Sequence, residues 1–332
     1  MQSALVKKTL KHFDLQPITY SEWRRLSMEA SFSPLVQSWQ YGDAKAKQGW
    51  IAHRFRIHAD GIDIGIIQVL EKKIFFFGGV AQINRGPIFL HSYLQDSKVD
   101  ADYSGIWNAL KKLARKKRWW YVAAMPEYYK HETSQFDFRK IGLRSIRNKE
   151  AWGSYRVSLD KSVDDLFMGL KGKWRNLLKK SLKADCEIHL VNEEEYMQLL
   201  VCYREFQQQA GFTGVPESLL VSMFQHKMTN EWNYRVLVAR ENETKELLAF
   251  VIVTEHGDTA NYLIGWSSNE GRRLSLNYRL LWLGIQQAKE RGLKWFDLGG
   301  VTKNTPKGIA HFKEGLNGEH YQLYGNFWFS FF

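Results

Sequence analysis

Cysteine is scarce in this chain of 332 residues, which contains only Cys186 and Cys202. Two cysteines in a chain of this length supply neither a disulfide framework nor the paired spacing of a metal site. Long apolar runs are missing too, both at the lysine-bearing N-terminus and further on, so the sequence shows no signal peptide and no membrane span. We therefore expect a cytoplasmic protein, and leave open whether it works at the inner face of the membrane.

Motifs of several common chemistries are missing as well. The chain has no GxxxxGK(S/T) loop and no GxGxxG fingerprint, which argues against a nucleotide triphosphatase and a dinucleotide site. It has no GxSxG elbow, and its ten histidines are scattered without an HExxH pattern. Covalent and metal catalysis are thus disfavoured, and we expect no metal and no cofactor. The (Q/R)xxGx(G/A) loop that holds the pyrophosphate of coenzyme A is not found either, which disfavours an acyl-CoA donor.

Positive charge, in contrast, is abundant. The chain has 47 lysines and arginines against 35 acidic residues, a net charge of +12, and two basic runs at Lys111–Arg118 and Lys171–Lys183. Such an excess favours anionic partners, whether nucleic acid, a phosphate-bearing substrate or a membrane surface. Helices with an ordinary solvated basic face explain the same runs, and charge alone does not decide between the two interpretations.

The length predicts about two domains, and the same order of elements occurs twice. In the first half, β-rich runs punctuated by glycine precede a helix near 103–117 and a strand at Trp119–Ala124. In the second half, the runs YRVLVAR, ELLAFVIVTEHG and TANYLIGWSS precede a helix near 276–291 and a strand at Lys294–Leu298. Hairpin strands, a helix and a further strand form the order of an α/β acyltransferase unit. We expect two such units in tandem, with mixed sheets flanked by helices.

We expect the boundary between the units near Val157–Asp160, where a strand meets a helix start. The first unit would comprise residues 1–156 together with 320–332, because the tail YQLYGNFWFSFF is too apolar to extend freely into solvent. The second unit would comprise residues 157–319. Its segment Val163–Met223 is predicted mostly helical, with one basic face and one packed face formed by Leu166, Leu170, Trp174, Leu177, Leu178 and Leu182. The basic face is either an ordinary surface or one that follows a phosphate backbone.

One lysine near the C-terminus is the main catalytic candidate. In WFDLGGVTKNTPKGIAHFKEGLNGE, residues 295–319, an apolar strand ends at Asp297, and Lys313 follows Phe312 two residues before Gly315. A lysine between an aromatic residue and a glycine can hold its ammonium beside a developing oxyanion or a phosphate. Without its context, such a lysine is more often a solvated surface charge.

A second candidate segment is QSWQYGDAKAKQGW, residues 37–50, in which Trp39, Tyr41 and Trp50 flank Lys45 and Lys47. Aromatic rings with interleaved cations suit a nucleotide or a sugar diphosphate. A helix that packs its aromatic residues is the simpler interpretation.

Arg85 precedes Gly-Pro in the strand-end motif INRGP, where it either clamps a ligand or links carbonyl groups of the protein, the second being favoured. This motif and the aromatic block are followed by the basic helix LKGKWRNLLKKSLKADCEIHLV, then NYLIGWSS, FDLGG and GIAHFKEGLNGE. Taken in order, these segments resemble the Fem-type (FemABX) aminoacyl-tRNA-dependent peptidyltransferases over nearly the whole chain. Such proteins have two GNAT-like units, with the C-terminal tail returning to the first, and build interpeptide bridges on peptidoglycan precursors.

The resemblance implies that an acceptor amine attacks the ester of an aminoacyl-tRNA, so that the enzyme mainly aligns its substrates and stabilises the oxyanion. Lys313 would be the catalytic lysine. Lys45, with Lys47 as its alternative, and Trp50 would hold the acceptor, and Tyr262 would line the substrate channel. We add Trp39, Tyr41 and Arg85 to the acceptor-binding candidates. The tRNA backbone would contact Lys171, Lys173, Arg175, Lys179, Lys180 and Lys183.

Two positions depart from the family pattern. Met125 stands where many relatives have an acidic residue proposed as a base, so either Glu127 substitutes or no side-chain base is needed. Gln209 stands where relatives that use a nucleotide-linked muropeptide have an arginine, which leaves the acceptor open. The alternatives are a GNAT-fold N-acyltransferase that uses acyl-CoA or another thioester on a sugar or peptide amine, and an RNA- or membrane-associated adaptor. We expect no stable protein partner, and peripheral membrane association stays open.

Overall fold

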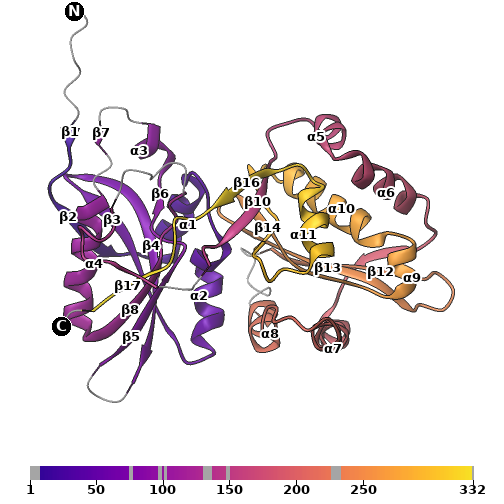
Figure 1. The fold of residues 1–332 in the computed structure, drawn as a ribbon, viewed down its shortest axis with the longest axis horizontal. Coiled ribbons are helices and arrows are strands. Elements are labelled where there is room, and N and C mark those ends of the chain that lie inside the picture. The colour runs from indigo at the N-terminus through magenta and orange to yellow at the C-terminus, as the bar shows by residue number, and fades with distance from the viewer. Residues whose placement is uncertain are drawn as a thin grey trace, which may run out of the picture. The chain divides into compact units, whose positions relative to one another are not determined.

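The computed structural model describes residues 8–74, 78–95, 99–100, 103–129, 137–146, 150–225 and 233–330. The chain forms two compact units, Met1–Ala151 with Gln322–Phe332, and Trp152–Tyr321. Each unit contains a mixed β-sheet with helices packed on it (Figure 1). The predicted α/β class, with two mixed sheets flanked by helices, is therefore confirmed.

The first unit is built on an 8-stranded sheet with the order β2-β3-β4-β5-β8-β17-β9, in which β6 also pairs with β4. Neighbouring strands are antiparallel except β5 and β8, which are parallel. The strands are β2 Phe13–Pro17, β3 Ile51–Ala59, β4 Ile62–Lys73, β5 Gly79–Asn84, β6 Ile88–Phe89, β8 Trp119–Met125, β9 Arg144–Ser145 and β17 Phe327–Phe329; the short strands β1 Lys8–Thr9 and β7 Val99–Asp100 pair separately. The helices are α1 Tyr20–Met28, η1 Leu35–Gln37, α2 Trp39–Ala46, α3 His91–Gln95 and α4 Tyr103–Lys117.

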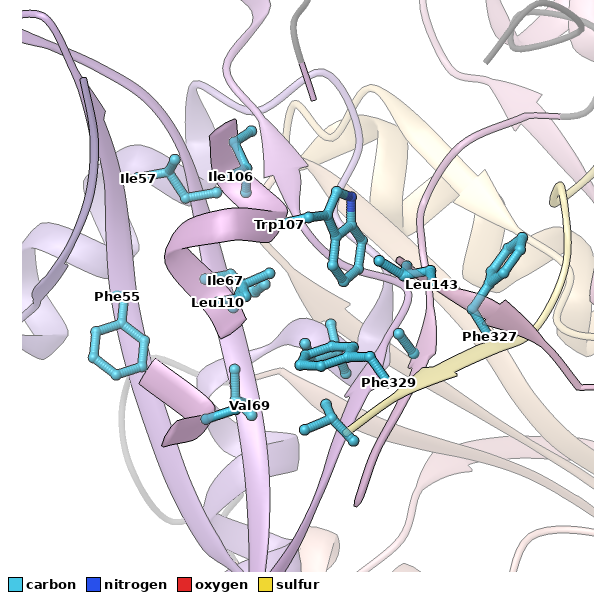
Figure 2. Packing of buried hydrophobic residues seen from close by; sticks show 14 of the residues in the cluster. Phe55, Ile57, Ile67, Val69, Ile106, Trp107, Leu110, Leu143, Phe327 and Phe329 are labelled. Carbon is cyan, nitrogen blue, oxygen red and sulfur yellow. The ribbon is translucent and has the colours of Figure 1, made fainter. Parts of the chain in front are cut away.

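Local sequence explains several of these elements. Thr19 and Glu22 form a capping box that starts α1. Asp60 and Gly61, both with positive φ, make the tight turn between β3 and β4. In α4 the apolar residues recur at helical spacing, so that Ile106 and Leu110 point onto the sheet and pack against strand residues such as Ile67 (Figure 2).

Strand β17 comes from the far end of the chain. It pairs antiparallel with both β8 and β9, and its Phe327 and Phe329 enter the core of the first unit (Figure 2). The apolar character of the tail is explained by this burial. Phe331 and Phe332 lie outside the described residues.

The second unit has a 7-stranded sheet with the order β11-β12-β13-β14-β15-β10-β16. Its strands are β10 Gly153–Ser158, β11 Glu187–Leu190, β12 Tyr234–Arg240, β13 Leu247–His256, β14 Thr259–Ser267, β15 Trp295–Asp297 and β16 Glu319–Gln322. Its helices are α5 Val163–Gly169, α6 Gly172–Leu182, α7 Glu193–Ala210, α8 Glu217–Gln225, α9 Asn269–Arg273, α10 Leu276–Glu290 and α11 Lys307–Glu314. Helices α6 and α10 lie on one face of this sheet, and α7 and α8 on the other (Figure 1).

The two units share one connection. In each, a strand is followed, through a segment that contains one long helix, by a parallel neighbouring strand: β5, α4 and β8 in the first unit, and β14, α10 and β15 in the second. A parallel pair needs such a crossover. The repeated order of elements along the sequence therefore reflects a repeated connection in space.

The helical segment predicted in the second unit is interrupted between α5 and α6, because Leu170 and Lys171 have extended ψ angles near 142°. Trp174 and Leu178 of α6 are buried as the spacing predicts. The same spacing places Leu182 on the packed face, but Leu182 is 52% exposed. It is the last residue of α6, and the buried stripe of the helix ends with Ser181.

Candidate active site

Lys313 lies in the last turn of α11 and is almost fully buried, with 7% of its surface exposed. Its Nζ donates a hydrogen bond to the carbonyl oxygen of Gly300 at 2.9 Å. Burial lowers the pKa of Lys313 to about 8, although the nearby Asp297 carboxylate raises it in part. The side chain is therefore a held ammonium close to its titration point, rather than a solvated surface charge.

The loop that accepts this bond is fixed by Asp297 at the end of β15. This buried carboxylate accepts from the Ser154 hydroxyl at 2.9 Å, from the Gly299 N–H at 2.7 Å and from the Tyr321 hydroxyl. Strands β10 and β16 carry the two hydroxyls, so three separate parts of the chain converge on Asp297. The network orients the Gly299-Gly300 turn toward Lys313.

Both glycines of this turn are required by their surroundings. Gly299 has a φ of +71°, and a Cβ there would lie 2.9 Å from the carbonyl oxygen of Tyr262. A Cβ on Gly300 would lie 2.4 Å from the Trp152 indole. Any larger residue would displace the carbonyl that holds the ammonium, which accounts for the DLGG sequence.

An aromatic cluster lines the other side of Lys313. Its Nζ lies 5.8 Å from the centroid of the Tyr262 ring, within the range of a cation–π contact. Tyr262 is buried, which raises the pKa of its hydroxyl. The preceding residue Phe312 packs against both Tyr262 and Tyr278, with ring centroids 6.2 and 5.0 Å apart. Aromatic rings therefore shield this side of the ammonium from bulk water.

Helix α6, which carries the predicted tRNA-binding residues, packs directly on α11. The Trp174 indole N–H donates to the carbonyl oxygen of Phe312 at 3.0 Å, and the backbone N–H of Lys171 donates to the carbonyl oxygen of Gly315 at 3.0 Å. The Lys171 ammonium also pairs with Glu314. A Cβ on Gly315 would lie 2.5 Å from the Trp174 ring, so the glycine after Lys313 permits this contact.

The predicted tRNA-binding side chains fall into two groups. Lys171 is paired with Glu314, Arg175 donates to the Met168 carbonyl at 2.9 Å, and Lys179 lies 5.8 Å from the Phe167 ring centroid. The second group is Lys173, Lys180 and Lys183, which are exposed and form no ion pair within the described part of the chain. Their binding of tRNA stays a prediction.

In the first unit, the structure brings together the acceptor-binding candidates Lys45 and Trp50. Lys45 lies at the end of α2, and its Nζ is 5.3 Å from the centroid of the Trp50 ring and 2.9 Å from Gln48 Oε1. The pKa of Lys45 is lowered, first by burial and second by the positive charge of Lys72. Lys47 caps the same helix and is exposed.

Trp39 has several packing partners, and Tyr41 on the same helix is partly buried. The Arg54 guanidinium stacks 3.9 Å from the Trp39 ring centroid, and Tyr20 and Trp23 pack edge-on against the same indole. Burial raises the pKa of Tyr41 to about 12. These contacts are those of a helix that packs its aromatic residues, and an additional role in acceptor binding stays a prediction.

Arg85 forms a buried ion pair with Glu127. Its Nε and Nη2 donate to the two carboxylate oxygens at 2.7 and 2.8 Å, and both side chains are about 5% exposed. The Tyr129 hydroxyl also donates to Glu127, at 3.2 Å. The ion pair thus occupies both carboxylate oxygens of Glu127, the residue suggested above as a substitute for the acidic residue missing at Met125. A role of Arg85 in acceptor binding stays a prediction.

A comparison of the sequence with models of protein families identifies the family of this chain. The model of the FemAB family matches residues 18–152 and 225–331, more than half of the chain. The chain belongs to the FemAB family. Membership implies an aminoacyltransferase with aminoacyl-tRNA as its donor, as the sequence resemblance predicted.

Solved structures support the fold of this FemAB protein. The crystal structure of FemX is 17% identical, with a TM-score of 0.78, and the match covers 96% of this chain and 97% of that one. L-PGS from Bacillus licheniformis is 12% identical with a TM-score of 0.54, covering 95% and 92%. A tandem GNAT protein from the clavulanic acid biosynthesis pathway is 12% identical with a TM-score of 0.53, covering 97% and 99%. The predicted tandem GNAT-like fold is thus confirmed.

No match was found among curated protein sequences. Within the described residues, none of the helices of this FemAB protein has the length and apolar character needed to cross a membrane. In the same residues, no three His, Cys, Asp or Glu side chains are grouped so that they could hold a metal ion.

Several residues that shape the site carry no signal in the sequence. Ser154 and Tyr321 hold Asp297 from positions 143 and 24 residues away, and no local pattern marks them. The spacing assigns Trp174 only to a packed helix face, although its indole bonds to the backbone beside Lys313. Lys72 is one lysine among many in the sequence, and its position relative to Trp50 follows from strand pairing alone.

Proposed function

We propose that this FemAB protein transfers an amino acid from aminoacyl-tRNA to an amine of a peptidoglycan precursor peptide, and so forms interpeptide bridges. One observation carries the proposal: the basic helix α6 and the helix of the buried Lys313 are joined by the Trp174–Phe312 and Lys171–Gly315 hydrogen bonds. A tRNA backbone bound along α6 would have its acceptor end close to the lysine. The family assignment supplies the donor.

The proposed chemistry is a direct attack on the ester. The acceptor amine nitrogen forms a bond to the ester carbonyl carbon, the bond from that carbon to the ribose oxygen breaks, and the proton lost by the amine ends on the departing ribose hydroxyl. Lys313 stabilises the negative oxygen that develops between these events. An ammonium has three N–H donors, and Gly300 accepts one, so two are left for the substrate.

Burial makes Lys313 suited to this role. A charge held in a water-poor environment by a fixed carbonyl acts on a developing oxyanion more strongly than a mobile, solvated one. With a pKa of about 8, Lys313 is still mostly protonated at neutral pH. Because the ester donor is already activated, alignment and oxyanion stabilisation are the main contributions required of the protein.

The test is transfer of radiolabelled amino acids from a mixed pool of charged tRNAs to a nucleotide-linked muropeptide and to lipid II. We expect labelled acceptor that is lost when ribonuclease is added beforehand. Subtracting single amino acids from the pool would then identify the one transferred. If neither acceptor is labelled while a known family member is active in the same mixture, the proposal is wrong. Labelling from acyl-CoA instead would favour the N-acyltransferase alternative.

A further inference from the structure

Asp297 is a buried carboxylate that takes no part in the bond-making steps proposed above. It ends β15 and is 1% exposed. Its Oδ1 accepts hydrogen bonds from the Ser154 hydroxyl at 2.9 Å and the Gly299 N–H at 2.7 Å, and its Oδ2 accepts from the Tyr321 hydroxyl. Burying a carboxylate costs free energy even when it is hydrogen-bonded, so its position near the buried Lys313 needs an explanation.

The backbone alone fixes both ends of the turn that follows Asp297. The Leu298 N–H donates to the carbonyl oxygen of Tyr155 at 2.9 Å, and the Val301 N–H donates to that of Gly153 at 2.7 Å. Both acceptors belong to β10. A carboxylate is therefore not needed to attach this turn to the sheet.

Asp297 acts on the middle of the turn. Its Oδ1 holds the N–H of Gly299, and the carbonyl oxygen of the next residue, Gly300, accepts from Lys313 Nζ at 2.9 Å. The ammonium lies directly against this turn, since a Cβ on Gly299 would be 3.6 Å from Nζ. Asp297 therefore contributes two things to the site: the orientation of the turn that holds Lys313, and a negative charge.

Several other titratable groups lie around the last turn of α11. Three are tyrosines whose pKa values are raised by burial, so they stay neutral: Tyr155, Tyr262 and Tyr278. Lys171 of α6 and Glu314 of α11 lie at the surface and pair with each other, with His311 close to Glu314. Asp297 differs from these groups, because burial lowers the pKa of Lys313 to about 8 and the Asp297 carboxylate opposes this lowering.

We propose that Asp297 is a positioning residue for the transfer reaction, which orients the Lys313 ammonium through the Gly299-Gly300 turn and favours its charged form. A nearby negative charge stabilises an ammonium, and more so where water is excluded. Asp297 acts through Lys313 and contacts no reacting atom. The inference rests on the proposed function in taking Lys313 to be the group that stabilises the oxyanion.

The experiment compares the kinetics of the full-length protein with those of Asp297→Asn and Tyr321→Phe. Asparagine keeps the size of the side chain and can hydrogen-bond to the same neighbours, but it has no charge. Tyr321→Phe removes one hydrogen bond to Asp297 and keeps the charge, so it is the matched control. Transfer from charged tRNA is measured between about pH 6 and about pH 9, and kcat and KM are obtained separately.

We expect Asp297→Asn to lower kcat by about tenfold or more near pH 8, with little change in KM, because a misplaced or neutral lysine affects the reaction rather than binding. Without the negative charge the pKa of Lys313 is lower still, so the variant loses its ammonium at a lower pH. The ratio of variant to unmodified kcat should therefore decrease as the pH rises through neutrality. For Tyr321→Phe this ratio should be independent of pH.

A second measurement follows the lysine without any transfer. Lys313 is titrated by nuclear magnetic resonance in protein with isotope-labelled lysine, and Lys313→Met assigns its signal. We expect this signal to titrate at a lower pH in Asp297→Asn than in the unmodified protein or in Tyr321→Phe. Such a result without tRNA-dependent transfer would retain the effect of Asp297 on Lys313 and reject the proposed function.

The inference is overturned by a kcat ratio for Asp297→Asn that is independent of pH, by an unchanged titration of Lys313, or by an equal pH dependence in Tyr321→Phe. Normal tRNA-dependent transfer in the unmodified protein would leave the proposed function intact in each case. If Asp297→Asn does not fold, Ser154→Ala/Tyr321→Phe replaces it, since it keeps the charge and removes both hydroxyl donors. A lower kcat with unchanged KM would then support the orienting role, and a normal kcat would overturn it.

Discussion

The Trp174 indole donates to the carbonyl oxygen of Phe312 at 3.0 Å, so the residue before Lys313 is anchored by a side chain of the basic helix. The Phe312 ring packs on the same indole, with centroids 5.9 Å apart. A displacement of α6 must therefore be felt at the backbone that carries the ammonium. Helix α6, proposed to bind tRNA, is therefore directly coupled to the backbone that positions Lys313.

Replacing Lys313 by methionine tests the catalytic assignment. The variant keeps most of the side-chain volume but has no charge, and we expect its turnover to fall by roughly 100-fold or more, the scale of losing one oxyanion donor. Single-turnover transfer from charged tRNA is the measurement. Lys307→Met, an exposed lysine at the start of the same helix, is the control. Near-normal turnover in a Lys313→Met protein that binds both substrates would show that the assigned role is wrong.

The turnover should depend on pH through the same residue. Lys313 must be protonated to stabilise an oxyanion, and its pKa is about 8, so its contribution is complete well below that value and is lost as the pH rises through it. The acceptor amine also titrates, but this effect is common to protein and variant. We therefore expect the ratio of unmodified to Lys313→Met turnover to decrease above pH 8. A ratio independent of pH would contradict this.

The buried ammonium should also reduce stability at neutral pH. The folded state holds Lys313 with a pKa of about 8, below the ordinary value of 10.5 that the unfolded chain has. Between these two values the unfolded state binds more protons, so the free energy of unfolding rises with pH there. Lys313→Met should lack this rise and be more stable than the unmodified protein at neutral pH. Urea titrations across the pH range measure both effects, and equal curves for the two proteins would count against them.

Charge reversal on α6 tests the tRNA surface. Lys180 and Lys183 are exposed and, among the described residues, free of ion pairs, so Lys180→Glu/Lys183→Glu should weaken tRNA binding. The slope of log affinity against log salt should fall in magnitude by about one for each phosphate that the variant no longer neutralises. Filter binding at several salt concentrations gives both quantities. Lys161→Glu, an exposed lysine outside α6, is the control, and an equal weakening there would exclude a specific surface.

Replacing Arg85 tests whether this residue is a structural link or clamps a ligand. Arg85→Ala leaves the buried Glu127 carboxylate without its main partner, which should lower the free energy of unfolding by about 3–5 kcal/mol. Urea denaturation provides the measurement, and Arg139→Ala, at an exposed arginine, is the control. A fully stable Arg85→Ala protein that no longer binds the acceptor would instead support the ligand-clamp interpretation.

Local sequence predicted those parts of the fold and site that depend on local interactions. The spacing of Ile106 and Leu110 indicated α4, and the aromatic residue before Lys313 together with the glycine after it suggested a held lysine. The partners of Asp297 could not be predicted, because Ser154 and Tyr321 reach it only through the pairing of strands from both ends of the second unit. Lys72 meets Trp50 for the same kind of reason, through the register of β3 and β4.

Strand β17 has a consequence for biosynthesis. Its residues lie between β8 and β9 in the first sheet, yet they follow the whole second unit in the chain. A ribosome therefore delivers every strand of the second unit before the first sheet can be completed. Until then, the edges of β8 and β9 that pair with β17 are unpaired. Such open edges in the nascent first unit can pair with the wrong strand. We expect the second unit to reach its native form first, although it is made later.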